Sequence, residues 1–581
     1  MRMRANVVLT SLLVVVALAV VGCGDDEASE TTAAQTTATT QPETPATTQP
    51  ETPATGGTVR IGIGGAPEDL NPGNGVLAED YTLYELVYDT PISIDLDGNY
   101  IPELATDWTV SDDGLTWTLT LRDDALFHDG TPVTSEDVKY SIEIFRDYED
   151  WGGFLGAYAY YFTDVQAPDP TTVVLTTDEP LGAFEAQMVF MYIVPKHIWE
   201  PAGDPVAFTN DEMIGSGSFK LAEIRQNEYV TLAANADYWG GAPIVDEVVF
   251  QTYENPDARV QALINGDADM ITEFPNTAIA TLEATPNVKV VTGAPLAPEL
   301  RDIFFNVTEP EDCPADDGVC SGHPALRDVQ VRRALAHGVD KQQMITIGLL
   351  GLGDPGLGLV PTGLPRFFAE ELVAQDYAFD LAEGNALLDA AGYADTNSDG
   401  IRECPDGAEC GPTGDLTLRL NYPTDIDEAP RLAELLKGWW GDLGVNVEIA
   451  GLDPDTLTSV CCPTFDYDVI IWGWGSDPDP GFLLSVLTCA EVPTGTSETG
   501  YCNADYDDLF AQQAVATDPA QRRDMIVEMQ RIALEDVPYI IPYYQQATEA
   551  YRTDRFTGWM DSASKLALED PTSLNVIRPA G

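Results

Sequence analysis

Residues 108–141 read WTVSDDGLTWTLTLRDDALFHDGTPVTSEDVKYS, and the middle of this stretch has the pattern of a β-strand. Apolar and polar residues alternate strictly from Leu115 to Leu121, directly after the dipeptide Asp113-Gly114. Strict alternation after a turn-forming pair predicts a strand with one buried face. The stretch therefore predicts a β-sheet that packs one face on a core.

Outside this stretch, strand and helix signals alternate along the chain. Residues 59–63, VRIGI, alternate as a strand. Asp380 and Glu383 form a capping box that predicts the start of a helix, and Gly392 marks its end. Helical spacing or start and stop signals also occur at 327–345, at about 428–443 ahead of the strand VNVEI, and at 519–537. We expect a mixed α/β protein whose sheets are covered by helices.

The N-terminus has the pattern of an export leader. Arg2 and Arg4 precede an apolar stretch at 7–21, and Gly22 stands before Cys23. A charged start, a short apolar segment and a small residue at the cut predict a cleaved signal at 1–22. The sequence VVG before Cys23 resembles the lipobox of bacterial lipoproteins, with valine where that motif usually has leucine.

Lipidation of Cys23 would anchor the protein outside the cell, because two acyl chains hold stably where one is marginal. The alternative is a plain signal peptide with an incidental cysteine. Residues 23–56 favour the anchor, since they consist of Thr, Ala, Pro, Gln and acids and repeat QPETPAT from 41 and 49. Such a composition predicts a disordered, somewhat extended linker between lipid and folded body.

The size and charge of the remaining chain limit its function. Roughly 525 residues exceed what one hydrophobic core organises, so at least two lobes are expected. There are 96 acidic and 28 basic residues, a net charge of -68, which excludes nucleic acid as a partner. The excess indicates either adaptation to salt or attraction of cationic ligands. We favour the first, because the acids are spread along the whole chain.

Eight cysteines follow Cys23, an even number that suits an oxidising compartment. Three pairs lie close enough in sequence to close short loops by disulfides: Cys313 with Cys320, Cys404 with Cys410, and Cys489 with Cys502. The adjacent Cys461 and Cys462 stay unassigned. The sequence lacks CxxC pairs and interleaved histidines, so no zinc site is expected.

Five segments in chain order resemble the family 5 solute-binding proteins of ABC importers, which bind peptides, oligopeptides and nickel. The resemblance covers nearly everything after Gly57. Its segments are residues 108–141, GSGSFKL from Gly215 with LAANADYWGGAPIVDEVVF, RVQALINGDADM from Arg259, DVQVRRALAHGVDKQQMI from Asp328, and DLAEGNALLDAAGY from Asp380.

The resemblance implies a two-lobed clamshell of the type II periplasmic binding protein class. Lobe I would contain 57–299, with an inserted subdomain near 93–210, and would be completed by 547–581. Lobe II would be 300–546, with hinge crossings near Leu300 and Tyr544. A monomer of this kind closes on its ligand and docks on a membrane permease, without catalysis, cofactor or metal.

The segment from Trp472 to Pro480, WGWGSDPDP, is the candidate ligand site. It follows the apolar residues DVII, and α/β proteins usually bind ligands at the carboxyl ends of strands. In peptide binders of the family, an aspartate after Gly-Trp-x-x holds the ligand's α-ammonium, which falls here on Gly473, Trp474 and Asp477. The bland alternative is that the Asp-Pro pairs form turns and that Trp472 and Trp474 are core residues.

The same resemblance bears on the length of the ligand. Cys489 and Cys502 fall where dipeptide-binding members carry a disulfide. Those members also hold the ligand carboxylate with an arginine before the helix at 428–443. Here NYPTDIDEAP starts at Asn421, and no arginine occurs before Arg431. A longer peptide therefore fits better than a dipeptide.

Alternative functions and sites stay open. Tryptophans also stack on sugar rings, so an oligosaccharide is the alternative ligand. A secreted hydrolase is the rival from another class, because paired carboxylates can act as acid and nucleophile, but the sequence has no catalytic motif. Asp395, Asn397 and Asp399, with Asp406, resemble a calcium loop or an acidic turn without metal. GLGDPG from Gly351 is interpreted as a loop.

Overall fold

The computed structural model describes residues 56–580 apart from short internal segments. These segments are 149–150, 152–154, 296–298, 315–317, 406–409, 411–413, 463, 494 and 562–565. The predicted leader, Cys23, all but the last residue of the predicted linker, and Asp406 lie outside the described residues. In the part that is described, no helix is both long and apolar enough to cross a membrane.

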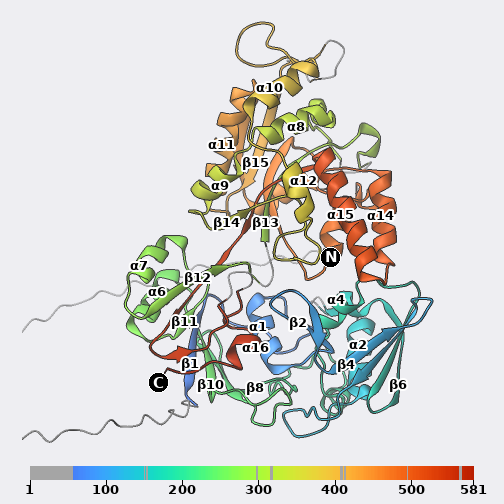
Figure 1. The fold of residues 1–581 in the computed structure, drawn as a ribbon, viewed down its shortest axis with the longest axis vertical. Coiled ribbons are helices and arrows are strands. Elements are labelled where there is room, and N and C mark those ends of the chain that lie inside the picture. The colour runs from blue at the N-terminus through green and yellow to red at the C-terminus, as the bar shows by residue number, and fades with distance from the viewer. Residues whose placement is uncertain are drawn as a thin grey trace, which may run out of the picture. The chain divides into compact units, whose positions relative to one another are not determined.

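One large sheet combines the N-terminal half of the described chain with a strand from its C-terminal end (Figure 1). β1 (Thr58–Ile63) lies inside it, parallel to β10 (Glu247–Thr252) on one side and to β11 (Met270–Ile271) on the other. In sheet order its strands are β12 (Val288–Gly293), β19 (Ala547–Arg552), β11 (Met270–Ile271), β1 (Thr58–Ile63), β10 (Glu247–Thr252), β9 (Tyr229–Ala234) and β8 (Phe219–Arg225).

A four-stranded antiparallel sheet contains the strand predicted at 115–121. Its order is β4 (Ala105–Val110), β5 (Thr116–Leu121), β7 (Thr172–Thr177) and β6 (Phe162–Asp169). Trp117, Leu119 and Leu121 are buried, as the alternation predicts, and Gly114 has the positive φ of 75° that its turn requires. Helix α2 (Ser135–Asp147) follows, and its capping box is formed by Thr134 and Asp137.

The second large sheet is built from the C-terminal half of the chain. In order its strands are β14 (Gly353–Pro355), β18 (Tyr539–Gln545), β13 (Glu299–Phe305), β17 (Val469–Gly475), β15 (Thr417–Pro423) and β16 (Asn446–Leu452). Figure 1 shows helices gathered around it. They are α8 (Val329–His337), α9 (Lys341–Gly348), α10 (Leu381–Ala390), α11 (Ala429–Asp442), α12 (Pro454–Cys461), α14 (Ala504–Ala514) and α15 (Pro519–Asp536).

The chain passes between the two large sheets where β12 leads to β13 and where β18 leads to β19. Only Gln546 separates β18 from β19. Each large sheet packs on its own cluster of buried apolar side chains. The remaining elements are α1 (Ala78–Val87), β2 (Ile92–Ile94), β3 (Tyr100–Pro102), α3 (Leu155–Ala159), α4 (Phe184–Val189), α5 (Lys196–Ala202), α6 (Pro256–Asn265), α7 (Ile279–Glu283), α13 (Gly481–Ser485), β20 (Phe556–Thr557), α16 (Pro571–Leu574) and β21 (Arg578–Pro579).

The structure differs from the sequence-based expectations in two elements. The helical stretch at 327–345 is two helices, α8 and α9, because Gly338 ends the first and the Asp340 side chain caps the second by accepting from Gln343 N at 2.9 Å. The segment GLGDPG is not wholly a loop, since residues 353–355 form the edge strand β14 against β18. An edge strand tolerates Pro355 because proline has no backbone N–H, and the outer side of an edge strand needs no donor.

Candidate ligand-binding site

Both tryptophans of the predicted site lie on strand β17 itself, which extends to Gly475. The strand pairs antiparallel with β13, so that Trp474 lies opposite Leu300 and Trp472 opposite Asp302. Both indoles are half-buried against the core of the second sheet. The site therefore begins on a rigid strand and continues into the loop after Gly475, which differs slightly from the predicted start directly after DVII.

Gly473 lies between the two tryptophans in sequence, and a glycine is required there because β13 packs closely against its backbone. A Cβ atom there would lie 2.5 Å from the Leu300 carbonyl oxygen and 2.8 Å from Arg301 Nη1. Arg301 Nη1 donates to the Trp472 carbonyl at 3.2 Å, and its Nη2 donates to Glu428 Oε1 at 2.9 Å. The buried ion pair of Arg301 with Glu428 thus holds β17 through the Trp472 carbonyl. Direct contact of Gly473 with a ligand stays a prediction.

The Trp474 side chain is held by a second buried acid. Its Nε1 donates to Glu498 Oε2 at 2.9 Å, and its ring packs edge-on against Phe482 with 5.6 Å between centroids. Tyr539 OH donates to the same Glu498 oxygen at 2.9 Å. Burial, followed by the charge of Asp302, raises the pKa of Glu498 well above its usual range.

Asp302 lies behind Trp472. Its Oδ1 accepts from Trp472 N at 3.2 Å, whereas its Oδ2 has no hydrogen-bond partner among the described residues. Burial raises the pKa of Asp302 to about 7, although the neighbouring Arg301 lowers it. Two acids with raised pKa values therefore support the tryptophan strand.

Asp477 is accessible to water but is also enclosed by protein. Desolvation raises the pKa of its carboxyl, and the charge of Asp479 raises it further. Tyr158 of α3 is close enough that the charge of Asp477 adds to burial in raising the pKa of its phenol, and Asp479 acts in the same way on Tyr161. Tyr158 and Tyr161 precede the edge strand β6, so the loop after β17 lies within electrostatic reach of this edge of the four-stranded sheet.

Asp479 is not available as a free ligand anchor, because it is paired. Arg522 of α15 forms a two-pronged ion pair with it, with Nη2 to Oδ1 at 2.7 Å, and both side chains are buried. Asp479 Oδ1 also accepts from Gly481 N at 2.9 Å. Of the two aspartates in SDPDP, Asp477 is the exposed one.

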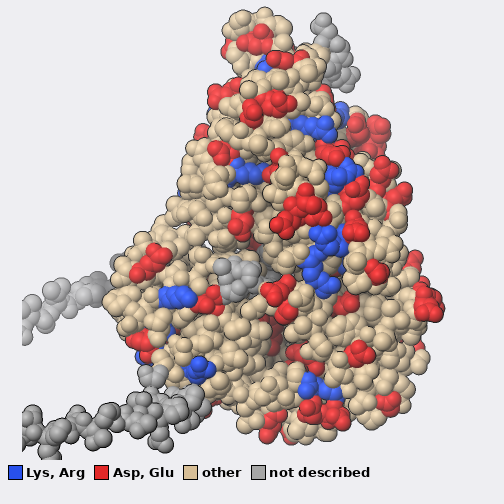
Figure 2. Space-filling view, in the orientation of Figure 1, with Lys and Arg blue, Asp and Glu red and all other residues tan. Residues whose placement is uncertain are grey.

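A pocket of about 350 Å³ lies beside this loop, between α4 and the start of α15. A smaller hollow next to it shares three residues with it and is lined also by Pro478 and Ile94. The residues that line the larger pocket are Tyr100, Gly182, Ala183, Glu185, Pro365, Arg366, Phe367, Thr517, Pro519, Ala520, Arg522 and Arg523. Figure 2 shows acidic side chains scattered across the visible face, with basic ones in a few small groups.

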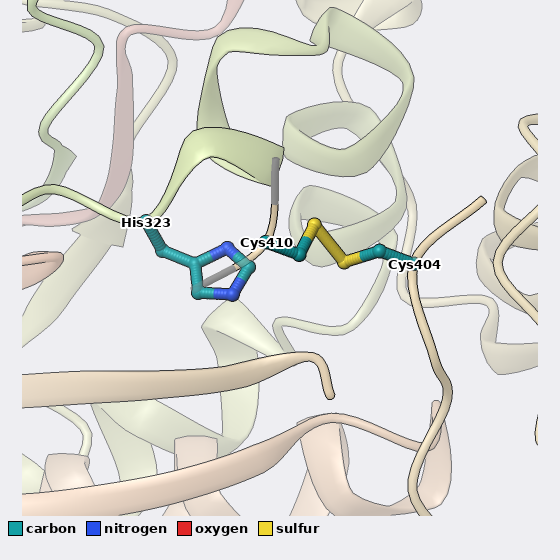
Figure 3. Close-up of side chains that lie close together, drawn as sticks. All are labelled: His323, Cys404 and Cys410. Atoms are coloured by element: carbon teal, nitrogen blue, oxygen red, sulfur yellow. A yellow bond between two sulfur atoms is a disulfide. The ribbon is translucent and has the colours of Figure 1, made fainter. Parts of the chain in front are cut away.

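The structure joins each of the three cysteine pairs proposed from sequence by a disulfide, and it joins Cys461 to Cys462. Figure 3 shows His323 beside the bridge between Cys404 and Cys410. The imidazole nitrogen and the two sulfurs that could serve as metal ligands lie within 4.8 Å of one another. Two sulfurs bonded to each other are not thiolates, so this group is not a metal site in the disulfide form.

In the turn that resembles a calcium loop, side-chain oxygens accept hydrogen bonds from backbone N–H groups of the same turn. Asp395 Oδ1 accepts from Ser398 N at 2.6 Å and Oδ2 from Gly400 N at 3.0 Å, while Asn397 Oδ1 accepts from Asp399 N at 2.8 Å. These contacts stabilise the acidic turn. They occur in turns with and without a cation, so the calcium loop and the plain turn both stay predictions.

Two sheet-bearing lobes with a pocket between them define a two-lobed binding protein of type II. The chain belongs to the bacterial extracellular solute-binding proteins, family 5, since the model of that family's middle region matches residues 99–493. It is 24% identical over 554 residues, covering 94% of both chains, to the oligopeptide-binding protein AppA of Bacillus subtilis. It is 25% identical to the dipeptide-binding protein of Escherichia coli, over 84% of this chain and 90% of the relative.

Solved structures share the fold. The ABC transporter substrate-binding protein CtaP of Listeria monocytogenes has a TM-score of 0.75 at 24% identity, covering 91% of this chain and 100% of that one. AppA of Bacillus subtilis in complex with a nonapeptide has a TM-score of 0.65 at 22% identity, with the same coverage. The similar proteins thus include peptide-binding members of ABC importers.

Sequence reasoning missed several residues around the site. Glu498, Asp302 and Tyr158 come from three distant parts of the chain, and none stands in a motif. Arg366 follows a proline in an irregular segment and gave no signal of its own. The one available signal was Glu498 lying between the paired cysteines 489 and 502.

Proposed function

We propose that this chain is the substrate-binding lipoprotein of an ABC importer, which captures oligopeptides outside the cytoplasm and delivers them to a membrane permease. The observation that carries this proposal is the position of Asp477. It follows two half-buried indoles on β17, and Pro478 of the same loop lines a hollow next to a pocket that is lined from both halves of the fold. A carboxylate at the edge of such a pocket suits the ammonium group of a peptide.

The lobe division proposed is 57–299 with 547–581 for lobe I and 300–546 for lobe II. Sheet membership supports it, since β19 at 547–552 returns to the sheet of β1 while β13 to β18 stay together. Ligand contacts to both lobes at once would favour the closed state. The proposed anchor is lipid on Cys23, and the proposed role needs no catalysis.

Two properties of the chain support a peptide without a fixed length. Arg431, the first arginine after Asn421, lies within α11 and donates to the Gly348 carbonyl at 3.4 Å, outside the candidate site. The start of α11 is occupied instead by Glu428, paired with Arg301. The carboxylate anchor of dipeptide-binding members is therefore not reproduced there.

Native mass spectrometry after mixing the purified protein with a random library of two- to eight-residue peptides tests the proposal. We expect intact peptides to stay bound and small-angle scattering to show a more compact particle with ligand than without. Oligosaccharide binding in place of peptides would support the alternative ligand. Release of cleaved peptides would indicate a hydrolase and contradict the proposal.

A further inference from the structure

The pocket between α4 and α15 has a cationic wall in a strongly acidic protein. Arg366, Arg522 and Arg523 all line it. Arg522 is neutralised by Asp479, and Arg523 by Glu371 with Nη2 to Oε2 at 3.2 Å. Arg366 forms no ion pair or hydrogen bond with a residue that the structure describes, although the chain has 96 acids for 28 bases.

The Arg366 guanidinium is instead held by aromatic rings. It lies over the ring of Tyr100, 4.4 Å from the centroid, and 5.7 Å from that of Phe367. Stacking uses the face of the guanidinium, whereas its N–H donors point outward in the plane. The group is thus fixed in place with its donors unused by described residues.

Tyr100 contributes a second unused donor. Its hydroxyl is buried and has no hydrogen-bond partner among the described residues. Buried polar groups are nearly always paired in folded proteins, so an unpaired one at a pocket wall indicates a ligand group. Burial, and then the charge of Asp479, raises the pKa of the Tyr100 phenol, which keeps the hydroxyl protonated as a donor.

We propose that this pocket binds a carboxylate of the captured peptide, with the Arg366 guanidinium and the Tyr100 hydroxyl as its donors. The inference rests on the proposed peptide-binding function and deepens it. The start of α15, whose residues Pro519 and Ala520 line the pocket, adds the positive end of a helix dipole. In the region where α15 approaches α4 in Figure 1, Figure 2 shows a group of basic side chains.

Among the described residues that line the pocket, Glu185 is the one acid, and it restricts how a ligand can lie. It accepts from Trp108 Nε1 at 3.4 Å and does not pair with Arg366. A carboxylate is favoured beside Arg366 and repelled beside Glu185, which suits a peptide N–H instead. Pro478, next to Asp477, lines the adjoining hollow together with Arg366. The loop that carries Asp477 therefore borders the hollow next to the Arg366 pocket.

The test compares three synthetic peptide mixtures of four to eight residues by native mass spectrometry and calorimetry. The first has free carboxyl termini and no acidic side chain, the second is the same mixture amidated, and the third is amidated with one internal glutamate. The proteins are wild type, Arg366→Gln, Tyr100→Phe and, as a matched control, Arg531→Gln. Arg531 is an arginine of α15 that pairs with Glu528 and Glu535.

We expect wild type and Arg531→Gln to bind the free acids at least about tenfold more tightly than the amides, as loss of a charge-assisted hydrogen bond predicts. Arg366→Gln should remove the difference. Tyr100→Phe, which deletes only the unpaired hydroxyl, should reduce the affinity difference between free acids and amides. If Arg366→Gln folds poorly, this variant provides the test in its place. If the amidated mixture with an internal glutamate binds as tightly as the free acids, the pocket holds a side-chain carboxylate. If it binds as weakly as the other amides, the pocket holds the C-terminal carboxylate.

Equal binding of acids and amides by wild type overturns the inference and leaves peptide binding intact. An equal loss for acids and amides in Arg366→Gln also overturns it, because Arg366 would then act in lobe closure, by pairing with Glu185. Failure of all three mixtures to bind wild type refutes the proposed function itself. The two failures are therefore distinguishable.

Discussion

The indole Nε1 of Trp474 donates a hydrogen bond of 2.9 Å to Oε2 of Glu498, which lies in the loop closed by Cys489 and Cys502. The same oxygen accepts from Tyr539 OH at 2.9 Å. A candidate ligand-binding ring is thus positioned by a buried acid that no ligand needs to touch. The disulfide-bonded loop and the tryptophan strand act as one structural unit.

Glu498 should tolerate glutamine but not alanine. Burial raises its pKa, so the folded protein holds it neutral, and the glutamine of Glu498→Gln is neutral too and keeps an acceptor for both donors. Alanine leaves the Trp474 and Tyr539 donors buried without a partner. We expect Glu498→Ala to lower the free energy of unfolding by about 2–3 kcal/mol and Glu498→Gln by under about 1 kcal/mol. Urea unfolding measures both, and equal losses would contradict a neutral acid.

The protein should be more stable at pH 5 than at pH 8. Burial raises the pKa of Asp302 to about 7, so between its usual value and about 7 the folded protein keeps a proton that the unfolded chain releases. Its contribution is therefore fully present below pH 4 and is lost as pH rises towards 7.

Asp302→Asn should flatten that pH dependence, by an amount on the order of 2–4 kcal/mol across the window. Denaturant unfolding at pH 5, 6, 7 and 8 measures the slope. Asp524→Asn, an exposed acid on α15, is the control and should keep the wild-type slope. If the slope of unfolding free energy against pH is the same in Asp302→Asn as in wild type, the Asp302 carboxyl of the wild-type protein is ionised in the folded state.

Local signals were sufficient for most elements of the fold. The alternation at 115–121 became β5, the capping box at Asp380 opens α10, and the stop before Pro538 ends α15 at Asp536. Such signals depend on neighbours within a few residues. They failed where a single glycine and a new cap divide one apolar stretch, as between α8 and α9.

The surroundings of the site could not be predicted, because they depend on contacts between distant residues. Trp472, Trp474 and Asp477 were found through one local motif. Their supports, Glu428 with Arg301 and Glu498 with Trp474, join positions 127 and 24 residues apart. The pocket around Arg366 forms only where the chain's two halves meet.

The ion pair of Arg522 with Asp479 should stabilise the site loop, and removing one partner alone should lower the free energy of unfolding strongly. Both side chains are buried, so Arg522→Gln leaves an unpaired charge and should cost about 3–5 kcal/mol. The double variant Arg522→Gln with Asp479→Asn should lose less than the sum of the single variants. A double-mutant cycle by urea unfolding measures this coupling.

Arg523→Gln on the next residue is the control, since its pair with Glu371 is exposed and should contribute at most about 1 kcal/mol. Strict additivity of the Arg522 and Asp479 variants would show that the pair does not couple α15 to the loop.

Asp477→Asn should abolish recognition of a peptide ammonium while leaving the fold intact. The carboxyl is water-accessible and has Asp479, already paired with Arg522, as its acidic neighbour, so its charge is available to a cationic ligand. We expect affinity for peptides with a free N-terminus to fall by about 2–5 kcal/mol. N-acetylated peptides should bind wild type and variant alike, and Asp425→Asn, an exposed acid before α11, should change neither.

The raised pKa of Asp477 gives this test a second readout. Ionised carboxylate is the form that binds an ammonium group, so wild-type affinity should decline on acidification at a higher pH than an ordinary aspartate would give. The decline should be absent in Asp477→Asn. Calorimetric titrations at pH 7, 6, 5 and 4 measure it. An unchanged peptide affinity in the variant at pH 7 would refute the anchor role and favour an uncharged ligand, such as a sugar, stacked on Trp472 and Trp474.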